Sequence, residues 1–275
     1  MVRLGCCLPG GSFMPQGEEQ IPASTESVLL EGTQIIAEAG YSYSEICAGL
    51  LCELSEEEVA RLAQAHGAGK LPLEVCNSFI PGDLPILEPG KQEALRRYTE
   101  TVIARASRLG IDTIVFGSGK ARRIPEGMSR EEGIAGIHNF LRMCNAFGEQ
   151  YDVTIAIEPL NRRECNVLNT VAEGAEMVHA LQLSKVRLLA DAFHMYCEAE
   201  DFSVLQRERE ILVHIHVAEP PDRVYPGRDG GEYLMGFAQA LQSSGYCGRV
   251  SVECGFTDFN SEIMSARAFL EEAFS

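Results

Sequence analysis

Four residues that could take part in chemistry each close a short apolar run in the second half of the chain. They are Glu158, Asp191, His216 and Glu253. Successive members are separated by 33, 25 and 37 residues, which is about one β/α unit each time. If consecutive strands bring them together, three buried carboxylates would repel one another and lose solvation, and a divalent cation would correct both penalties. The spacing therefore predicts a site for one metal ion.

The donor types indicate which ion such a site would hold. Carboxylate oxygens with one imidazole suit a hard to borderline ion, so Mn²⁺ is the predicted cofactor and Co²⁺, Mg²⁺ or Zn²⁺ are alternatives. Each residue alone has a simpler explanation, because a carboxylate at a strand end can cap the next helix and a single histidine is more often a core residue. His214 is assigned that core role. The conjunction of four strand ends favours metal binding.

A metal held by carboxylates suits proton transfer next to a carbonyl group. That reaction needs a base near the carbon and stabilisation of the oxygen that becomes negative in the enediolate. The ion would chelate the carbonyl oxygen and the adjacent hydroxyl and hold a planar cis-enediolate. Two carboxylates on opposite faces of such a substrate would invert the configuration of a carbon, whereas one shuttling along a single face would move the proton between neighbouring carbons. Both outcomes stay open at this point.

Positioning these residues requires a particular arrangement of strands, and the sequence supplies eight of them. The apolar runs span 2–9, 43–50, 71–79, 111–119, 153–159, 186–193, 212–219 and 249–256. Amphipathic segments of helical length follow several runs, and Ser55 and Ser129 precede acidic residues as helix N-caps do. The pattern predicts α/β architecture, a single (β/α)8 TIM barrel, with residues 1–275 forming one domain. The turn CCLPGGSF lacks GxGxxG, which disfavours a doubly wound sheet.

Alternation along the fifth run gives Glu158 its direction. The large apolar side chains of 153–157 would face the surrounding helices, which turns Glu158 inward at the carboxyl end of its strand. Barrel active sites are assembled at that end. The same interpretation applies to the sixth, seventh and eighth runs.

Composition narrows the classes of partner. The chain has 275 residues and a formal net charge of −17, which argues against nucleic acid because phosphates would be repelled. No apolar run reaches the roughly 20 residues that span a membrane, and no leader pattern is present, so a soluble cytoplasmic protein is expected. The ten cysteines are scattered without a CxxC pair and are interpreted as reduced thiols. A small-molecule substrate held by a metal or a local basic pocket is compatible with this acidity, and a homo-oligomer stays open.

Four motifs resemble one known family. EPLNRRE at 158–164, DAFH at 191–194, HVAEPPDR at 216–223 and SVECGF at 251–256 resemble motifs of the xylose-isomerase-like TIM-barrel superfamily. Within it, the resemblance is to the ketose 3-epimerases of the D-tagatose 3-epimerase and D-psicose 3-epimerase group. The third motif departs from the pattern, because Ala218 replaces a glycine and Arg223 follows His216 by seven residues rather than six.

The resemblance implies roles for individual residues. Glu158 and Glu253 would both bind the metal and exchange the substrate proton, and Asp191 and His216 would complete the ligand set. The substrate contacts would be Glu164, His194 and Arg223. The expected activity is metal-dependent isomerisation or epimerisation of a ketose or related hydroxy-ketone, with C3 epimerisation favoured.

Other functions fit the same barrel. An aldose–ketose or hydroxypyruvate-type isomerase shares the metal set, and a dehydratase or lyase could also use a metal-stabilised enolate. A sugar- or metal-binding protein without catalysis is a further alternative. A DNA-repair endonuclease is disfavoured by the acidity of the chain and by a total of six histidines.

A basic segment after the fourth run offers a second candidate for ligand binding. FGSGKARR carries Lys120, Arg122 and Arg123 behind a glycine turn. The GxxxxGK[ST] spacing of a P-loop fails here. These charges could contact an anionic substrate or lie in a solvated loop, and the solvated loop is the favoured interpretation.

Overall fold

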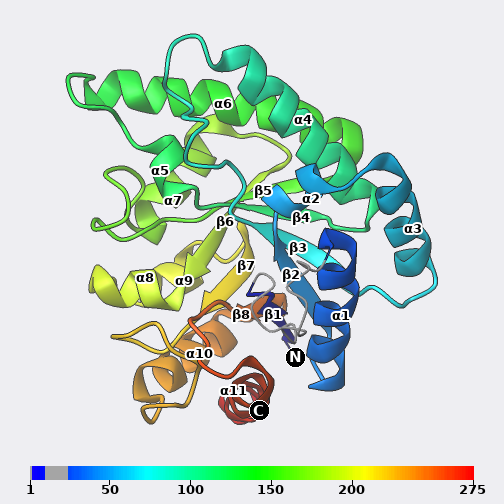
Figure 1. The fold of residues 1–275 in the computed structure, drawn as a ribbon. Coiled ribbons are helices and arrows are strands. Elements are labelled where there is room, and N and C mark those ends of the chain that lie inside the picture. The colour runs from blue at the N-terminus through cyan, green and yellow to red at the C-terminus, as the bar shows by residue number, and fades with distance from the viewer. Residues whose placement is uncertain (1, 10–23) are drawn as a thin grey trace.

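The computed structural model describes residues 2–9 and 24–275, so positions 10–13 of the CCLPGGSF turn lie outside the described residues. Eight parallel strands follow one another in chain order and close into a barrel, with helices around the outside (Figure 1). The strands are β1 (Arg3–Cys7), β2 (Tyr43–Cys47), β3 (Leu73–Asn77), β4 (Thr113–Phe116), β5 (Thr154–Ile157), β6 (Val186–Asp191), β7 (Leu212–Val217) and β8 (Arg249–Val252). The predicted (β/α)8 barrel is confirmed, including its second strand, the one with the weakest apolar pattern.

Helices connect consecutive strands along the whole described chain. They are α1 (Thr25–Glu38), α2 (Gly49–Glu53), α3 (Glu56–Gly67), α4 (Gln92–Arg108), α5 (Gly119–Arg122), α6 (Arg130–Tyr151), α7 (Val171–Leu181), α8 (Ala192–Cys197), α9 (Ser203–Arg207), α10 (Glu232–Ser244) and α11 (Phe259–Ala273). Two of them begin with the predicted serine caps. Ser55 and Ser129 each form a capping box with the glutamate three residues later, which satisfies backbone N–H groups that a helix leaves free.

The barrel interior contains an apolar layer of side chains. Its buried apolar cluster consists of Tyr43, Val75, Val115, Ala156 and Leu189. Ala156 lies in this cluster, while Ile155 and Ile157 belong to the outer core between strands and helices, as alternation predicted for the fifth strand. The ring of Tyr43 needs a glycine opposite it, because a Cβ at Gly5 would lie 2.2 Å from its Cζ.

The amino-terminal end of the barrel is held by arginine–carboxylate pairs. Strands β1 and β8 close the sheet with Arg3 opposite Arg249, and both guanidinium groups contact Glu74. Arg249 also donates to Asp112 at 2.6 Å. Glu74 and Asp112 therefore each have an arginine as a permanently charged partner. At the carboxyl end of the barrel, by contrast, Glu158 is paired with a histidine.

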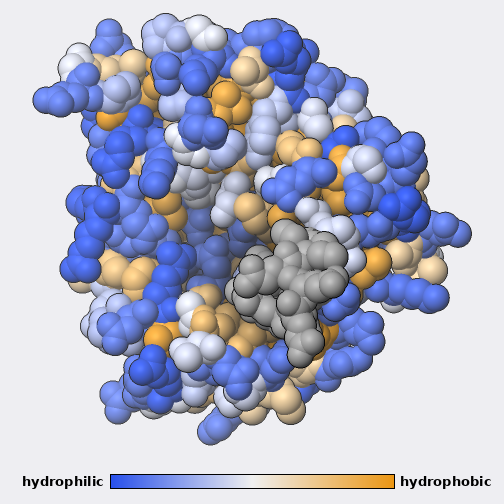
Figure 2. Space-filling model, in the orientation of Figure 1, coloured by the Kyte–Doolittle hydropathy of each residue, from blue (hydrophilic) through white to orange (hydrophobic). Residues whose placement is uncertain are grey.

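The remaining expectations about the chain concern its surface and its thiols. All ten cysteines are free, as predicted. Among the described residues, no helix has the length and apolar content needed to cross a membrane. The face shown in Figure 2 is largely hydrophilic, with apolar residues scattered between charged ones. This distribution agrees with the net charge of −17.

Candidate metal and active site

The four strand-end residues come together at the carboxyl end of the barrel. Glu158, Asp191, His216 and Glu253 each present one donor atom, and these atoms all lie within 4.8 Å of one another. They belong to or directly follow β5, β6, β7 and β8. Donors around a cation bound at roughly 2.1–2.4 Å are separated by about 3–4.8 Å, so this spacing fits one ion.

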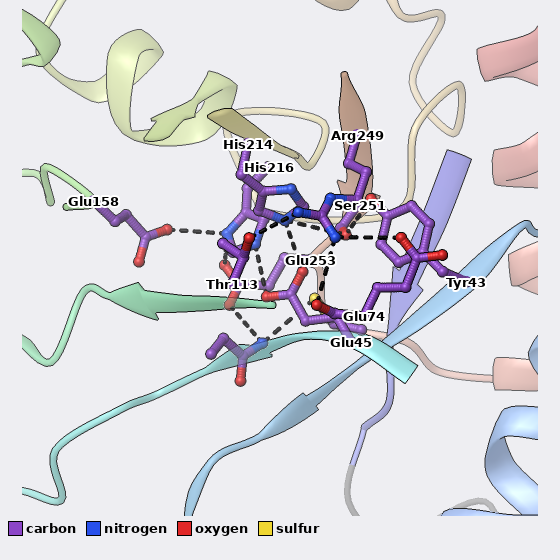
Figure 3. Close-up of polar contacts among 12 residues, drawn as sticks. Tyr43, Glu45, Glu74, Thr113, Glu158, His214, His216, Arg249, Ser251 and Glu253 are labelled. Atoms are coloured by element: carbon purple, nitrogen blue, oxygen red, sulfur yellow. Dashed lines mark hydrogen bonds and ion pairs between the residues drawn. The ribbon is translucent and has the colours of Figure 1, made fainter. Parts of the chain in front are cut away.

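His216 lies at the centre of the group. Its Nδ1 is 3.0 Å from Glu158 Oε1 and 3.3 Å from Glu253 Oε2 (Figure 3). Burial disfavours the charged imidazole, but the carboxylates of Glu45 and Glu253 outweigh it and raise the pKa of His216 well above its usual value. Without a metal, a proton on this imidazole therefore offsets part of the negative charge.

The two glutamates of the cluster have different acidities. Burial, reinforced by the charge of Glu253, raises the pKa of Glu158. Burial acts in the same direction on Glu253, but the charges of His216 and Arg223 prevail and lower its pKa to about 2. Two neighbouring carboxylates whose acidities are pushed apart are typical of acid–base sites.

Asp191 uses its two carboxylate oxygens for different purposes. Oδ1 accepts hydrogen bonds from the backbone N–H groups of Phe193 at 2.7 Å and His194 at 3.1 Å, and so caps helix α8. Oδ2 is buried and has no hydrogen-bond partner among the described residues. The cap and the metal ligand, which were competing explanations in sequence, are therefore available at the same time on one side chain.

The missing hydrogen bond at Asp191 Oδ2 indicates that a cation fits between the four residues. An ionised oxygen buried without a partner carries a large desolvation cost, and a cation would remove that cost. The donor set, three carboxylates and one imidazole, is the one a hard to borderline divalent ion prefers. The residues present therefore fit one divalent metal ion.

Arg223 shows that the cluster also contains a permanent positive charge. Its Nη2 lies 2.6 Å from Glu253 Oε2 and 3.9 Å from Asp191 Oδ2, and its guanidinium stacks on the ring of Phe193 at 5.2 Å. The repulsion among the carboxylates is therefore partly offset by this guanidinium even without a metal. The structure does place this arginine in the predicted site despite its shifted spacing after His216.

The two other predicted substrate contacts also lie in the site. His194 is buried, accepts a hydrogen bond from Asn161 Nδ2 at Nδ1 (2.8 Å) and leaves Nε2 without a hydrogen-bond partner among the described residues. Its Nε2 lies 4.0 Å from Asp191 Oδ2. Glu164 accepts from the same amide at 2.9 Å and lies 3.7 Å from Arg223 Nη1. Asn161 therefore orients both side chains.

A pocket of about 390 Å³ opens onto these residues. Its lining contains Glu158, Glu164, Arg223 and Glu253 together with Ser78, Tyr98 and Lys120. The pocket is large enough for a small ligand, and both acidic and basic side chains line it.

Two features of the site differ from the sequence interpretation. Glu45, which no motif singled out, is fully buried and lies 2.9 Å from His216 Nε2. The available signal was one acidic residue within the strand-like run YSEICAGL. The solvated-loop interpretation is wrong for Arg122, which is fully buried and donates to the carbonyl oxygens of Phe116 and Leu168. A loop arginine with this role cannot be distinguished from a solvated one by its position in the sequence.

Glu219, the acid of the third motif, has a structural partner. It accepts hydrogen bonds from the backbone N–H groups of Gly227 and Gly231 and bridges to Val224, and so holds the loop after β7. That loop carries Arg223, whose carbonyl accepts from Gly255 at 2.9 Å. Glu219 thus acts on the site through the arginine.

Comparison with known proteins adds independent information. The model of the family described as xylose isomerase-like TIM barrel matches residues 33–272. The D-psicose 3-epimerase of Agrobacterium fabrum is 27% identical over 226 residues, which are 79% of this chain and 76% of the relative. The 3-dehydro-D-guloside 4-epimerase of Escherichia coli is 24% identical and covers 82% of this chain and 86% of its own length. A solved L-ribulose 3-epimerase has a TM-score of 0.83 at 20% identity, covering 100% of this chain and 95% of its own, a likeness that concerns the fold.

Proposed function

Because this chain belongs to the xylose isomerase-like TIM barrel family, we propose that it is a divalent-metal-dependent enzyme that epimerises a ketose at C3. Relatives named as epimerases and isomerases support an enzyme of that class. The observation that carries the proposal is the group of four donor atoms within 4.8 Å, together with the Asp191 oxygen that has no hydrogen-bond partner among the described residues. Mn²⁺ is the proposed ion.

The proposed ion site consists of Glu158, Asp191, His216 and Glu253. A bound ion would supply Lewis-acid stabilisation of the negative charge that develops on the substrate oxygens. The protein side chains would do the rest. They would orient the ketose, hold its reacting carbon between two carboxylates, and move the proton.

Glu158 and Glu253 are the proposed acid–base pair. A carboxylate oxygen of one would take the proton from C3, and the carboxyl group of the other would return a proton to the opposite face. Burial raises the pKa of Glu158, whereas the charges of His216 and Arg223 lower the pKa of Glu253 to about 2. In the metal-free protein, this difference favours Glu158 as the group that gives a proton and Glu253 as the group that takes one.

Three further side chains would orient the substrate. His194 Nε2 and the Arg223 guanidinium are hydrogen-bond donors beside the carboxylates, and they would hold oxygens at the carbonyl end of the sugar. Glu164 lies at the edge of the pocket and would accept hydrogen bonds from hydroxyl groups farther along. Asn161 keeps His194 in the tautomer that donates from Nε2.

Isotope exchange tests the reaction and its position on the sugar. Protein stripped with a chelator and reloaded with Mn²⁺ would be incubated in D₂O with D-psicose, D-tagatose and D-fructose. Epimerisation at C3 places deuterium at C3, whereas aldose–ketose isomerisation places it at C1 or C2. Release of a dehydrated keto product, seen by its ultraviolet absorbance, would indicate the lyase alternative instead.

Two variants connect the result to the proposed residues. Glu253→Gln should lower kcat by about 10²-fold or more while leaving the unfolding temperature near that of the parent, because it removes a proton-transfer group from a well-packed barrel. Glu74→Gln, at the other end of the barrel, is the control for loss of a carboxylate. Failure of the metal-loaded parent to exchange any C–H proton across ketoses, aldoses and their phosphates would refute the proposal.

A further inference from the structure

Glu45 lies beneath the candidate site on the inner face of β2, and its side chain is fully buried. Among the described residues, no lysine or arginine forms an ion pair with it. Its ion-pair partners are two histidines of β7, with Oε1 2.9 Å from His216 Nε2 and Oε2 2.9 Å from His214 Nε2. A buried carboxylate needs such partners, because the desolvation of an ion costs several kcal/mol.

The geometry fixes the direction of both hydrogen bonds. An ionised carboxylate has no proton to give, so each imidazole donates its Nε2–H to Glu45. The ring of His216 is thereby oriented with Nδ1 toward Glu158 and Glu253, at 3.0 and 3.3 Å (Figure 3). A metal-binding histidine usually gives its second N–H to a carboxylate or carbonyl, which sets the ring orientation and tautomer.

His214 holds the other oxygen of Glu45 in place. Its Nε2 also lies 3.3 Å from Ser251 Oγ, and that hydroxyl is 3.0 Å from the hydroxyl of Tyr43. The His214 and His216 rings meet edge to face at 5.0 Å, with an angle of 82° between their planes. Rotation of the Glu45 carboxylate would break two buried hydrogen bonds at once, so its orientation is over-determined.

From this arrangement we infer that Glu45 is a positioning residue, which fixes the tautomer and ring orientation of His216 so that Nδ1 faces the ion site, with His214 as its support. The inference rests on the proposed metal site, since it gives His216 the role of ligand. It adds a second layer to that site, built from β2, β7 and β8 across the barrel interior.

One other use of Glu45 is chemically conceivable. Donor atoms of Cys7, Glu45 and His216 also lie within 4.8 Å of one another, as those of a second ion site would. Both oxygens of Glu45 already accept imidazole N–H groups, and Asn77 Nδ2 is 3.4 Å from Cys7 Sγ. The positioning role uses these contacts as they stand, whereas a second ion would have to replace them.

Metal affinity measures the inferred role without any sugar. Mn²⁺ binding would be measured by chelator competition for the parent, Glu45→Gln, Glu45→Asp and the control Glu74→Gln. Glu45→Gln should bind Mn²⁺ about 10- to 100-fold more weakly, the range measured for losing the partner of a ligating histidine. Glu45→Asp should recover part of the loss, because it keeps the charge and the acceptor, and Glu74→Gln should match the parent.

Imidazole nitrogen NMR tests the tautomer in the parent protein itself, so the test survives if Glu45→Gln does not fold. In ¹⁵N-histidine-labelled protein loaded with diamagnetic Zn²⁺, the signal lost in His216→Gln should be that of a ring protonated at Nε2. A ring protonated at Nδ1, or unchanged Mn²⁺ affinity in folded Glu45→Gln, would overturn the inference. A stoichiometry of two bound ions per parent chain and one per Glu45→Gln chain would also overturn the inference, because it would make Glu45 a ligand of a second ion.

These outcomes separate the inference from the proposed reaction. If the parent binds Mn²⁺ and Glu45→Gln weakens it, but no ketose exchanges its C–H proton, the positioning role stands and the epimerase proposal fails. If the parent epimerises ketoses, and Glu45→Gln matches it in Mn²⁺ affinity and turnover, the epimerase proposal stands and the positioning role fails.

Discussion

A Cβ placed at Gly117 would lie 2.1 Å from Glu158 Oε2, so the glycine after β4 makes room for the carboxylate that follows β5. At the carboxyl ends of these neighbouring strands, the residue after β5 is the carboxylate Glu158, and the residue after β4 is a glycine that leaves space for it. The atom that meets this Cβ is the end of a flexible side chain, which can move away at small cost to folding.

Gly117→Ala should therefore impair the site more than the fold. We expect metal affinity and kcat to fall at least about tenfold, because the Glu158 carboxylate must leave its present position, while the unfolding free energy changes by no more than about 1 kcal/mol. Gly67→Ala is the matched control, since no atom lies within 4 Å of the Cβ it would add. Equal metal affinity in both variants would contradict the steric role of Gly117.

Asp191→Asn should separate the two uses of this side chain. The asparagine keeps an oxygen that can cap α8, but it removes the charge from Oδ2, the atom without a hydrogen-bond partner among the described residues. Mn²⁺ affinity should fall by at least about tenfold, with metal-free stability close to that of the parent or higher. Asp191→Ala should also lose the helix cap, which should lower the free energy of unfolding by about 1 kcal/mol relative to the parent. Thermal unfolding with and without chelator provides the measurement.

Metal binding should strengthen as the pH rises. Because the pKa of His216 in the metal-free protein is raised well above its usual value, its Nδ1 carries a proton at neutral pH that a cation must displace. One displaced proton corresponds to about a tenfold gain in apparent affinity per pH unit below that pKa. Titrations with Mn²⁺ at pH 6, 7 and 8 should show this slope or a steeper one, since the raised pKa of Glu158 acts in the same direction. An affinity independent of pH would contradict the assigned protonation.

Arg122→Ala should destabilise the protein without acting on the chemistry directly. The substitution removes two buried hydrogen bonds and opens a cavity, which together cost about 2–4 kcal/mol, although each carbonyl keeps a backbone N–H group as donor. Arg97→Ala, on the exposed side of α4, should change the unfolding free energy by no more than about 0.5 kcal/mol. Denaturant unfolding of the metal-free proteins compares the two arginines.

Lys120→Ala should distinguish neutral from anionic substrates. Of the two cationic side chains that line the pocket, Arg223 is paired with Glu253, whereas Lys120 has no acidic partner among the described residues. Loss of the lysine should raise KM about tenfold or more for a ketose that carries a phosphate or carboxylate, and less than twofold for a neutral ketose. Equal changes in KM for both classes would remove Lys120 from substrate selection.

Much of the fold and the first layer of the site could be predicted from local patterns. A parallel strand is buried on both faces, so it appears as an apolar run, and eight such runs with intervening helices can form a barrel. Within a strand, side chains alternate with a period of two, which is why the inward direction of Glu158 could be predicted. The serine caps at Ser55 and Ser129 are equally local, because the bonds they make span three residues.

Contacts across the barrel could not be predicted in the same way. Glu45 meets His216 over a separation of 171 residues, between strands that are not neighbours in the sheet. Their contact depends on the register of the strands and on closure of the barrel, which place both side chains in the interior. Arg122 likewise becomes a buried residue because the chain near Leu168 packs over it. Local residue types specify which atoms can bind a metal or a proton, whereas the packing of distant segments specifies which of those atoms lose water and meet one another.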